Sequence, residues 1–282
     1  MIILEVIYLK TDKIKYGILN ETVVPINLHP RFDSEMADEG LYGMIVKLLK
    51  DVGDGWYYVE THYNYNGYVH ESNMIMDEEK VKIWEENANS IITHSIVDVL
   101  PKAKYQGSLQ KLLTRGASII LTGKEEKNWV EVQLADGNKG WVKKVFVGDK
   151  ITSYNKENEE ELREKLVNTA MLYMGTQYRW GGKSPLGLDC SGLCSISYML
   201  NGIIIYRDAV RKDEYMRKIE LEEIKPGDLL FWPGHVAMYI GDDKYIHSSS
   251  GNSGVAINSL NPEDKEFKAS LAKTITDIGT IF

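Results

Sequence analysis

The stretch Leu188-Asp-Cys-Ser-Gly-Leu-Cys194 is a short polar turn that leads into an apolar run with helical spacing. It therefore predicts a helix with Cys190 at its start. A thiol at a helix N-terminus lies close to unpaired backbone N–H groups and to the positive end of the helix macrodipole, which together favour the thiolate. Because a thiolate attacks carbonyl carbons, Cys190 is the candidate nucleophile.

Two histidines follow on segments with the alternation of β-strands. His235 lies in the segment Gly-His-Val-Ala-Met-Tyr-Ile, and His247 lies in Lys-Tyr-Ile-His-Ser. We expect His235 to deprotonate Cys190, or to hold it as an ion pair, and then to protonate the leaving amine. His247 would orient the His235 ring, and the backbone N–H of Cys190, with Ser191 or a neighbouring donor, would stabilise the oxyanion. The set predicts a Cys-His-His hydrolase.

The two histidines must lie on the same face of a sheet to touch each other. Opposed residues of an antiparallel hairpin share a face, so the required register is one such as Ala237 opposite His247. Continued toward the turn, this register pairs Ile240 with Lys244 and leaves residues 241–243 as the loop. We therefore expect a turn of three or five residues, and a turn of two or four residues would separate the histidines.

Length, charge and cysteine content limit the class of protein. The chain has 282 residues, enough for two or three domains, and carries 33 basic against 41 acidic residues for a net charge of −8. This charge argues against nucleic acid as a partner. Cys190 and Cys194 are too few for a structural zinc site, so we expect no metal and no cofactor. Cys194 would face the core as a small hydrophobic residue.

The first ten residues form a short apolar run that Glu5 interrupts, with no basic leader and no small-residue cleavage site. This pattern predicts neither a signal peptide nor a membrane span. We therefore expect a cytoplasmic protein with no membrane partner, or an exported one if a leader has been removed.

The first half of the chain contains an internal repeat. Two segments each have a Trp, an alternating strand with Val, a turn, and then Gly, an aromatic residue and Val. Trp56 and Gly67 are 11 residues apart, and so are Trp129 and Gly140. The alternation and the turn residues predict two small β-barrels with both Trp side chains in their cores. The pattern resembles that of bacterial SH3-like domains.

The turn of the first repeat differs from that of the second. Thr61-His-Tyr-Asn-Tyr-Asn-Gly67 gathers polar and aromatic residues at a hairpin tip, where burial is difficult and ligand contact is easier. The second repeat has only Leu134-Ala-Asp-Gly137 there. We expect Tyr63 and Tyr65 to contact a ligand.

Two charged segments separate the units of the chain. Residues 77–89 predict a linker with at most one helical turn. The second charged segment begins at Asn155 and leads into a helix. Four apolar residues are spaced for one face of that helix: Leu162, Leu166, Ala170 and Met174.

Five motifs in the last part of the chain are similar to those of the NlpC-type papain-like cell-wall cysteine peptidases. They are Trp180-Gly-Gly, Leu188-Asp-Cys-Ser-Gly-Leu, Pro226-Gly-Asp-Leu-Leu-Phe, His235-Val-Ala-Met-Tyr-Ile-Gly241 and Tyr245-Ile-His-Ser248. The resemblance covers residues 160–282. It implies an α+β papain-like fold that cleaves within peptidoglycan stem peptides.

With two SH3-like units before it, the chain resembles one group of that family, the γ-D-glutamyl-L-diamino acid endopeptidases or dipeptidyl-peptidase VI group. These release L-Ala-γ-D-Glu from stem peptides with a free amino end, so peptidoglycan stem peptides or muropeptides are the implied partners. The expected fold class is an α+β papain-like catalytic domain preceded by two small all-β SH3-like barrels. The expected domains are a first SH3-like domain with an N-terminal extension at 1–78, a linker at 79–93, a second SH3-like domain at 94–150 and the peptidase domain at 151–282.

In that group the first SH3-like domain closes part of the cleft, and an acidic residue there holds the substrate amine. By resemblance, Glu35 and Tyr65 take these places, and Trp180 would form one wall of the cleft. Further substrate-binding residues are implied on the catalytic side: Asp189, Ser191, Arg207 and Asp208. An enclosed ammonium ion needs carboxylate partners, which suits the acidic members of this set.

The interpretation is thus a cysteine endopeptidase that hydrolyses the γ-D-glutamyl-L-diamino acid bond of stem peptides with a free N-terminal L-Ala, in murein peptide recycling. Two alternatives stay open: an exported wall-remodelling hydrolase with the SH3-like pair as wall anchor, and a non-catalytic muropeptide-binding protein. An acyltransferase or amidase with the same machinery is a further alternative. A requirement for a free substrate amine separates these from the main interpretation.

Overall fold

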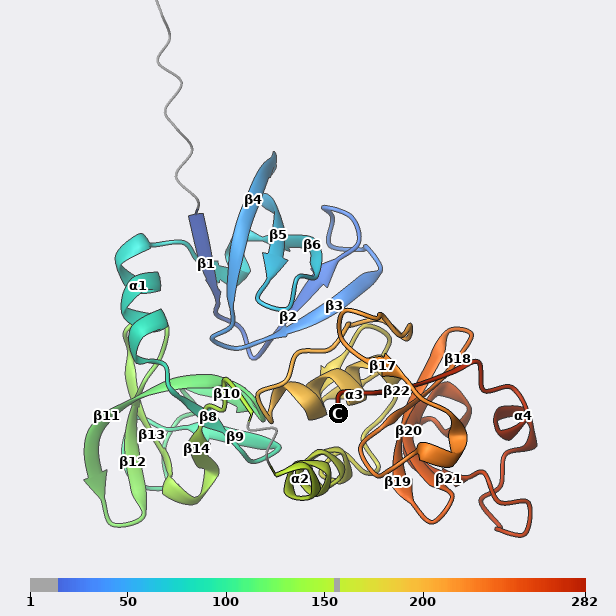
Figure 1. Ribbon diagram of the computed structural model, residues 1–282. Coiled ribbons are helices and arrows are strands. Elements are labelled where there is room, and N and C mark those ends of the chain that lie inside the picture. Colours follow the sequence, from blue (N-terminus) through green and yellow to red (C-terminus); the bar gives the residue numbers. More distant parts are fainter. Residues whose placement is uncertain (1–14, 155–157) are drawn as a thin grey trace, which may run out of the picture.

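The computed structural model describes residues 15–154 and 158–282. Figure 1 shows three units in chain order: two built mainly of strands, followed by one in which helices pack beside a sheet. Of the N-terminal segment whose place the sequence left open, residues 15–19 form a strand of the first unit, and residues 1–14 lie outside the described residues. No helix in the described part of the chain is long and apolar enough to cross a membrane.

The first unit is one antiparallel sheet of seven strands in the order β3-β2-β6-β5-β4-β1-β7. A 3-10 turn, Glu71–Asn73, separates its last two strands. The buried apolar residues of these strands form the interior of the unit, among them Ile18, Val24, Ile26, Val46, Val59 and Val69. The strands are β1 (Lys15–Leu19), β2 (Val23–Asn27), β3 (Met36–Leu41), β4 (Ile45–Gly53), β5 (Trp56–Thr61), β6 (Asn66–His70) and β7 (Met74–Ile75).

The second unit has a five-stranded sheet in the order β13-β12-β11-β8-β14 and a two-stranded sheet of β10 and β9. Its first strand begins at Ser90, inside the segment where the sequence predicts a linker. A 3-10 turn, Lys144–Phe146, precedes its last strand. The strands are β8 (Ser90–Ile92), β9 (Ile96–Val99), β10 (Lys111–Thr114), β11 (Ser118–Glu126), β12 (Trp129–Gln133), β13 (Lys139–Lys143) and β14 (Val147–Asp149).

The sequence repeat corresponds to one hairpin that occurs in both units. In the first unit Trp56 lies opposite His70, and in the second Trp129 lies opposite Lys143, which is the same separation along the chain. Both Trp side chains are buried, so the prediction that they are core residues is confirmed. The two hairpins therefore share their register as well as their sequence pattern.

The segment between the two β units is a helix, α1 (Glu78–Asn87). Asp77 caps its N-terminus, where the carboxylate accepts from the Lys80 N–H at 2.9 Å. Trp84 is buried and donates its indole N–H to the Gly43 carbonyl at 2.8 Å. The segment does connect the units, but the prediction of one helical turn is wrong. Its Glu and Lys residues favour a helix, and the Trp84 anchor stabilises one that would be too short to be stable alone.

The third unit contains the six-stranded sheet β17-β22-β18-β19-β20-β21, with α2 and α3 packed on each other and α3 packed against β19 and β20 (Figure 1). Its helices are α2 (Glu159–Met171), α3 (Cys190–Met199) and α4 (Ala269–Ala272). Its strands are β15 (Lys183–Ser184), β16 (Gly187–Leu188), β17 (Arg217–Lys218), β18 (Leu229–Trp232), β19 (His235–Gly241), β20 (Lys244–Ser249), β21 (Gly254–Ser259) and β22 (Asp277–Thr280). Short 3-10 turns occur at Leu221–Glu223 and Ser250–Asn252.

The predicted apolar face of α2 is confirmed in three of its four residues. Leu162, Leu166 and Ala170 are buried. Met174 is exposed and lies beyond the helix, which ends at Met171, so its assignment to this face is wrong. The turn that follows the helix breaks the 3.6-residue spacing on which the prediction depended.

The three units share their hydrophobic cores. One apolar cluster contains strand residues of the first unit together with residues of α2, α3 and the third sheet. A second cluster joins Ile18 and Tyr42 of the first unit to Trp84 of α1 and to the core of the second unit. The first unit is therefore packed against both of the others.

The register that brings the two histidines to one face is the predicted one. β19 and β20 pair Tyr239 with Tyr245 and Met238 with Ile246. Continued away from the turn, this pairing brings Ala237 opposite His247, which is the register proposed from the sequence.

The turn between these strands has two residues, so the predicted length of three or five is wrong. Asp242 and Asp243 both have positive φ, 51° and 57°, as a type I′ turn requires. Gly241 then pairs with Lys244, and a bulge at Ile240 takes up the extra residue. The expectation that a two-residue turn would separate the histidines is also wrong, because the bulge restores their common face.

The repeated glycines give a test of the shared hairpin. A Cβ at Gly67 would lie 2.5 Å from Ile26 Cγ2, and a Cβ at Gly140 would lie 2.4 Å from Val99 Cγ1. We expect Gly67→Ala and Gly140→Ala each to lower the free energy of unfolding by about 1–3 kcal/mol, because an adjacent strand must shift. Urea unfolding followed by circular dichroism measures the change.

Gly107→Ala is the matched control, since its Cβ would meet only Pro101, at 3.4 Å. We expect its unfolding free energy to lie within about 0.5 kcal/mol of the parent protein. If all three variants had the same free energy of unfolding, the close approach of the adjacent strands to Gly67 and Gly140 would be contradicted.

Candidate active site

The start of α3 is held by Asp189, its N-cap residue. One carboxylate oxygen accepts from the Gly192 N–H at 2.6 Å, and the other accepts from the Gly181 N–H at 2.8 Å. A Cβ at Gly192 would lie 2.0 Å from the Gly182 carbonyl oxygen, so the helix and the glycine-rich approach segment touch through backbone. Cys190 follows the cap and is 7% exposed, at the helix start that the sequence predicts.

Burial raises the pKa of the Cys190 thiol to about 11, and the neighbouring Asp189 carboxylate acts in the same direction. The backbone N–H groups of Val236 and Ser191 favour the thiolate, but burial outweighs them. The backbone N–H groups thus act in the direction expected of a helix start, although the net effect of burial is to raise the pKa of the thiol. The thiol is protonated at neutral pH and needs a base.

His235 and His247 lie together on the sheet. Nε2 of His235 is 2.7 Å from Nδ1 of His247. Burial lowers the pKa of His235 to about 4, and the neighbouring His247 lowers it further, while burial also lowers the pKa of His247. Both rings are therefore neutral at neutral pH, as a general base must be. In the described residues, no three His, Cys, Asp or Glu side chains are grouped so that they could hold a metal ion.

Strand β19, which begins with His235, lies against Cys190. Val236, the next residue, presents its backbone N–H to the Cys190 sulfur. Nδ1 of His235 has no hydrogen-bond partner within the two described ranges, and the ring's other nitrogen is occupied by His247. Nδ1 is therefore the nitrogen open to the thiol proton. A neutral thiol and a neutral imidazole can exchange this proton as the sulfur attacks.

A buried cluster of charges joins the first unit to the catalytic unit. Asp38 of β3 accepts from Arg207 Nε at 2.6 Å and from Lys183 Nζ at 2.8 Å. All three side chains are at most 2% exposed. Although burial opposes ionisation, the charges of Lys183 and Arg207 hold the pKa of Asp38 below its ordinary value. Because an unpaired charge would be costly here, this cluster fixes the first unit on the catalytic unit.

Arg207 extends the same cluster to the start of α3. Its Nη1 donates to Ser191 Oγ at 2.7 Å and to Asp189 Oδ1 at 3.1 Å, and its Nη2 donates to the Gly181 carbonyl at 3.0 Å. Although burial opposes ionisation, the carboxylates of Asp38 and Asp189 raise the pKa of Arg207 above its ordinary value. Asp189, Ser191 and Arg207, three of the predicted substrate-binding residues, are therefore in contact. In this structure their polar atoms form hydrogen bonds with one another.

The two tyrosines of the first-unit hairpin tip have different surroundings. Tyr63 is 6% exposed, donates to Asp38 Oδ2 at 2.6 Å and accepts from Lys183 Nζ at 2.6 Å, so its predicted ligand contact is wrong. Tyr65 is half-buried and donates to Asp208 Oδ1 at 3.0 Å. Tyr65 and Asp208 therefore come together across the boundary between the units.

Glu35 and Trp180 each precede a residue at the contact between the first unit and the catalytic unit. Trp180 is 60% exposed, and Glu35 is exposed just before β3. A Cβ on Gly181 would lie 2.7 Å from the carbonyl oxygen of Met36, so the residues that follow Trp180 and Glu35 are in backbone contact. Within the described chain the Glu35 carboxylate has no ion pair, and its binding role stays a prediction.

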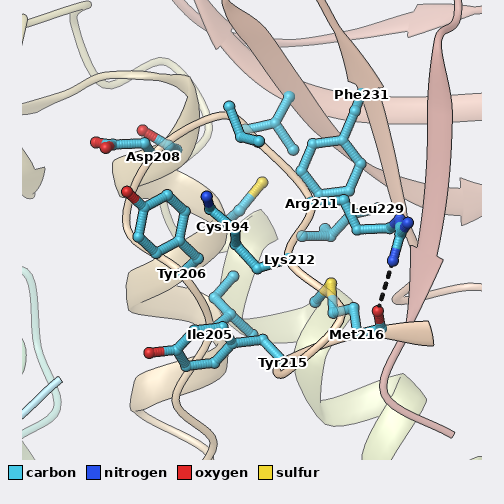
Figure 2. A pocket seen from close by; sticks show the side chains of 13 residues that line it. Cys194, Ile205, Tyr206, Asp208, Arg211, Lys212, Tyr215, Met216, Leu229 and Phe231 are labelled. Carbon is cyan, nitrogen blue, oxygen red and sulfur yellow. Dashed lines mark hydrogen bonds between the residues drawn. The ribbon is translucent and has the colours of Figure 1, made fainter. Parts of the chain in front are cut away.

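A small pocket lies beside α3 and the sheet (Figure 2). Asp208 and Tyr206 lie along one side of it, and Arg211 lies on the other, where it donates to the Met216 carbonyl at 2.9 Å. Cys194 faces the pocket and is 1% exposed, so its prediction as a buried core residue is confirmed. Apolar side chains make up most of the remaining wall: Ile205, Met216, Leu229, Phe231 and Val236.

Sequence analysis assigned no role to Asp38, Glu39 or Lys183. Asp38 and Lys183 are 145 residues apart, so no local pattern links them. Glu39 accepts from the Lys183 N–H at 3.2 Å and pairs with Arg179 at 3.3 Å, and burial raises its pKa. The sequence contains one hint of this cluster, the adjacent acids Asp38 and Glu39 in a short strand. Acids are rarely buried unless they are paired, so two of them in a strand suggest basic partners.

Comparisons with known proteins agree with this arrangement of units. A model of the NlpC/P60 family matches residues 175–271, and a model of the bacterial dipeptidyl-peptidase Sh3 domain matches residues 29–74. The catalytic unit thus has the papain-like NlpC/P60 fold, and an SH3 domain precedes it.

Two curated relatives are similar in sequence. Dipeptidyl-peptidase 6 of Lysinibacillus sphaericus is 39% identical over 257 residues, which are 90% of this chain and 94% of that protein. Gamma-D-glutamyl-L-lysine dipeptidyl-peptidase of Bacillus cereus is 34% identical over 140 residues, which are 46% of this chain and 41% of that protein. A crystal structure of an NlpC/P60 family protein from Bacillus cereus, 20% identical, has a TM-score of 0.76 and covers 93% of this chain and 98% of its own.

The raised pKa of Cys190 can be tested by alkylation. Because the folded thiol has a pKa of about 11, we expect iodoacetamide to react slowly at about pH 7 and faster as the pH rises beyond about 9. The rate is measured by mass spectrometry, with Cys190→Ala to separate any labelling of Cys194. A constant rate between about pH 5 and pH 9 would contradict the neutral pair, because it would indicate a thiolate held by imidazolium.

Proposed function

The chain belongs to the NlpC/P60 family of cysteine peptidases, and from this premise we propose that it hydrolyses the γ-D-glutamyl-L-diamino acid bond of peptidoglycan stem peptides with a free N-terminal L-Ala. One observation carries the proposal: a buried thiol, a neutral imidazole and an orienting imidazole occur in a chain that matches a dipeptidyl-peptidase over 90% of its length. The substrate class follows from that relative and from the gamma-D-glutamyl-L-lysine dipeptidyl-peptidase.

The reaction is an acyl transfer in two steps. Nδ1 of His235 takes the Cys190 proton as the sulfur attacks the γ-carbonyl carbon of D-Glu, and the oxyanion forms next to the backbone N–H of Cys190. The tetrahedral intermediate collapses to a thioester, and His235 returns the proton to the leaving amine of the diamino acid. Water, deprotonated by His235, then cleaves the thioester and restores the thiol. His247 keeps the His235 ring oriented throughout.

The free amine of L-Ala binds between the first unit and the catalytic unit. Asp208 is partly exposed and accepts from the Tyr65 hydroxyl at 3.0 Å, and it also has a hydrogen bond with Tyr206. A carboxylate has further acceptor positions, so Asp208 can also accept from an ammonium ion. Glu35, exposed just before β3, supplies a second carboxylate. An ammonium ion enclosed in a cleft is stable only with such partners. A free amine is a feature of soluble peptides released from the wall, which suits a role in murein peptide recycling.

Asp189, Ser191 and Arg207 contribute to substrate binding by shaping the cleft. Their mutual hydrogen bonds hold the start of α3 and the approach segment that carries Trp180. The small pocket bounded by Asp208 then receives an apolar part of the dipeptide, such as the L-Ala methyl group.

The second β unit is a second SH3-like domain. Two observations support this assignment. The second unit shares its hairpin register with the first, and in both units the repeated glycine lies tightly against an adjacent strand. The domain limits that fit the strands are a first SH3-like domain through Ile75, α1 as a connecting helix, a second from Ser90 to Asp149, and the peptidase domain from Asn158 onward.

The test is product analysis on two soluble peptides, L-Ala-γ-D-Glu-L-Lys and its N-acetylated form. We expect mass spectrometry to detect L-Ala-D-Glu from the free peptide alone, and no product with Cys190→Ala. Equal cleavage of both peptides would remove the amine pocket and favour a wall-remodelling hydrolase. Cleavage of neither would favour a non-catalytic binding protein or a different acyl substrate.

The amine pocket has its own prediction. Asp208→Asn removes a charge from the ammonium partner, and we expect it to raise KM for the free peptide by about 10- to 100-fold with a smaller effect on kcat. Asp98→Asn is the control, because Asp98 is exposed on β9 of the second unit and does not line the pocket. An unchanged KM in Asp208→Asn would show that the amine binds elsewhere.

A further inference from the structure

Two asparagines lie next to His247, on the side away from His235. Asn258 of β21 is 2% exposed, and its Oδ1 is 2.9 Å from His247 Nε2. Asn252, in the turn before β21, is half-buried, and its Nδ2 is 3.1 Å from the same ring nitrogen. The reaction proposed above assigns neither of them a part.

The orientation of the Asn258 amide is determined by the backbone. Its Nδ2 lies 3.0 Å from the carbonyl oxygen of Glu266, which can only accept a hydrogen bond. The amide nitrogen must therefore face Glu266, and the amide oxygen must face His247. Since that oxygen can only accept, His247 Nε2 carries a proton and donates it to Asn258.

The proton on Nε2 determines the state of the next nitrogen along the chain of hydrogen bonds. A neutral His247 protonated at Nε2 has a lone pair at Nδ1, which accepts from His235 Nε2 at 2.7 Å. A neutral His235 that donates from Nε2 has its own lone pair at Nδ1. This is the nitrogen that lacks a partner in the described residues and is open to the thiol.

We propose that Asn258 is a positioning residue that sets the tautomers of His247 and His235, so that His235 Nδ1 is ready to take the Cys190 proton. The inference rests on the proposed function for its catalytic consequence. The hydrogen-bond chain itself is a property of the substrate-free protein.

Asn252 has a different part in this cluster. Its Nδ2 donates to Asn258 Oδ1 at 2.9 Å, which helps to hold the amide in place. If Asn252 instead donated to a bare His247 Nε2, His247 would donate from Nδ1 and His235 would be protonated at the nitrogen that must accept the thiol proton. Asn258 excludes this inactive tautomer because its oxygen requires a proton on Nε2.

The groups that face the two rings are few. Trp232 and Tyr245 lie against them as aromatic neighbours, at ring-centroid distances of 5.5 Å from His235 and 5.2 Å from His247. Lys268 is the charged group whose field reaches His247 and lowers its pKa, whereas the hydrogen bond to Asn258 raises it. Among residues 15–154 and 158–282, the neighbours to consider are Cys190, Trp232, His235, Tyr245, Asn252, Asn258 and Lys268.

The experiment compares three variants, Asn258→Leu, Asn258→Asp and the control Asn87→Ala, on L-Ala-γ-D-Glu-L-Lys. Asn258→Leu removes the acceptor at similar volume, and we expect kcat to fall by at least about 100-fold with KM nearly unchanged. Asn258→Asp retains an acceptor, so we expect it to recover much of this loss. Its carboxylate stabilises imidazolium, so the acidic limb of the kcat–pH profile should move to higher pH. Asn87→Ala is the control and should stay within about threefold of the parent enzyme, because Asn87 is exposed on α1 and, within the described residues, its side-chain amide bonds only the Ile83 carbonyl.

A direct measurement of the tautomers accompanies the kinetics. In ¹⁵N-labelled protein without substrate, we expect NMR to show His247 protonated at Nε2 and bare at Nδ1, and Asn258→Leu to give a mixture. Circular dichroism at the assay temperature identifies any variant that does not fold, and the parent spectrum decides the assignment even if Asn258→Leu is unfolded.

Two results would overturn the inference: a parent spectrum with the His247 proton on Nδ1, or a folded Asn258→Leu enzyme with the parent kcat and pH profile. The predicted tautomers in a parent protein that cleaves neither peptide would instead contradict the proposed function and leave the hydrogen-bond chain intact.

Discussion

The buried guanidinium of Arg207 is the constraint on which the rest of the site depends. It is 2% exposed and bonds Asp38 of the first unit, the Asp189 cap of the catalytic helix and the Gly181 carbonyl of the approach segment. Removal of one partner from a buried ion pair costs about 3–5 kcal/mol. The first unit is therefore part of the active-site framework, because its displacement would leave Arg207 and Lys183 without the Asp38 carboxylate.

Two hydrogen-bonded systems meet at the start of the catalytic helix. From one side, Arg207 and Asp189 hold the backbone next to Cys190. From the other side, Asn258 and His247 hold the His235 ring in one orientation and one protonation pattern. The thiol and the imidazole are both neutral before substrate binds, so the geometry has to supply the reactivity that a preformed thiolate would otherwise provide.

The sequence was sufficient to place Cys190 at a helix start, to bring the two histidines together and to find the repeated hairpin, because each depends on a local pattern or on strand parity. It was insufficient where contacts between distant parts of the chain determine the local structure. The bulge at Ile240 reconciles a two-residue turn with the predicted register, and the Trp84 anchor converts a charged linker into a helix. The pairing of Asp38 with Lys183 and Arg207 joins residues 145 and 169 positions apart, which no spacing argument reaches. The sequence also could not show that burial raises the pKa of Cys190 by more than the backbone N–H groups at the helix start lower it.

The most direct test of this account is kcat/KM for Asp38→Asn, measured on L-Ala-γ-D-Glu-L-Lys at a temperature where circular dichroism shows the variant folded. Glu21→Gln is the control, since the Glu21–Lys111 ion pair also crosses between units, but Glu21 is half exposed. If Asp38 holds Arg207 and the helix start in place, Asp38→Asn lowers kcat/KM by about 100-fold and the control leaves it unchanged. A folded Asp38→Asn protein with the parent kcat/KM would contradict the claim that the first unit completes the active site.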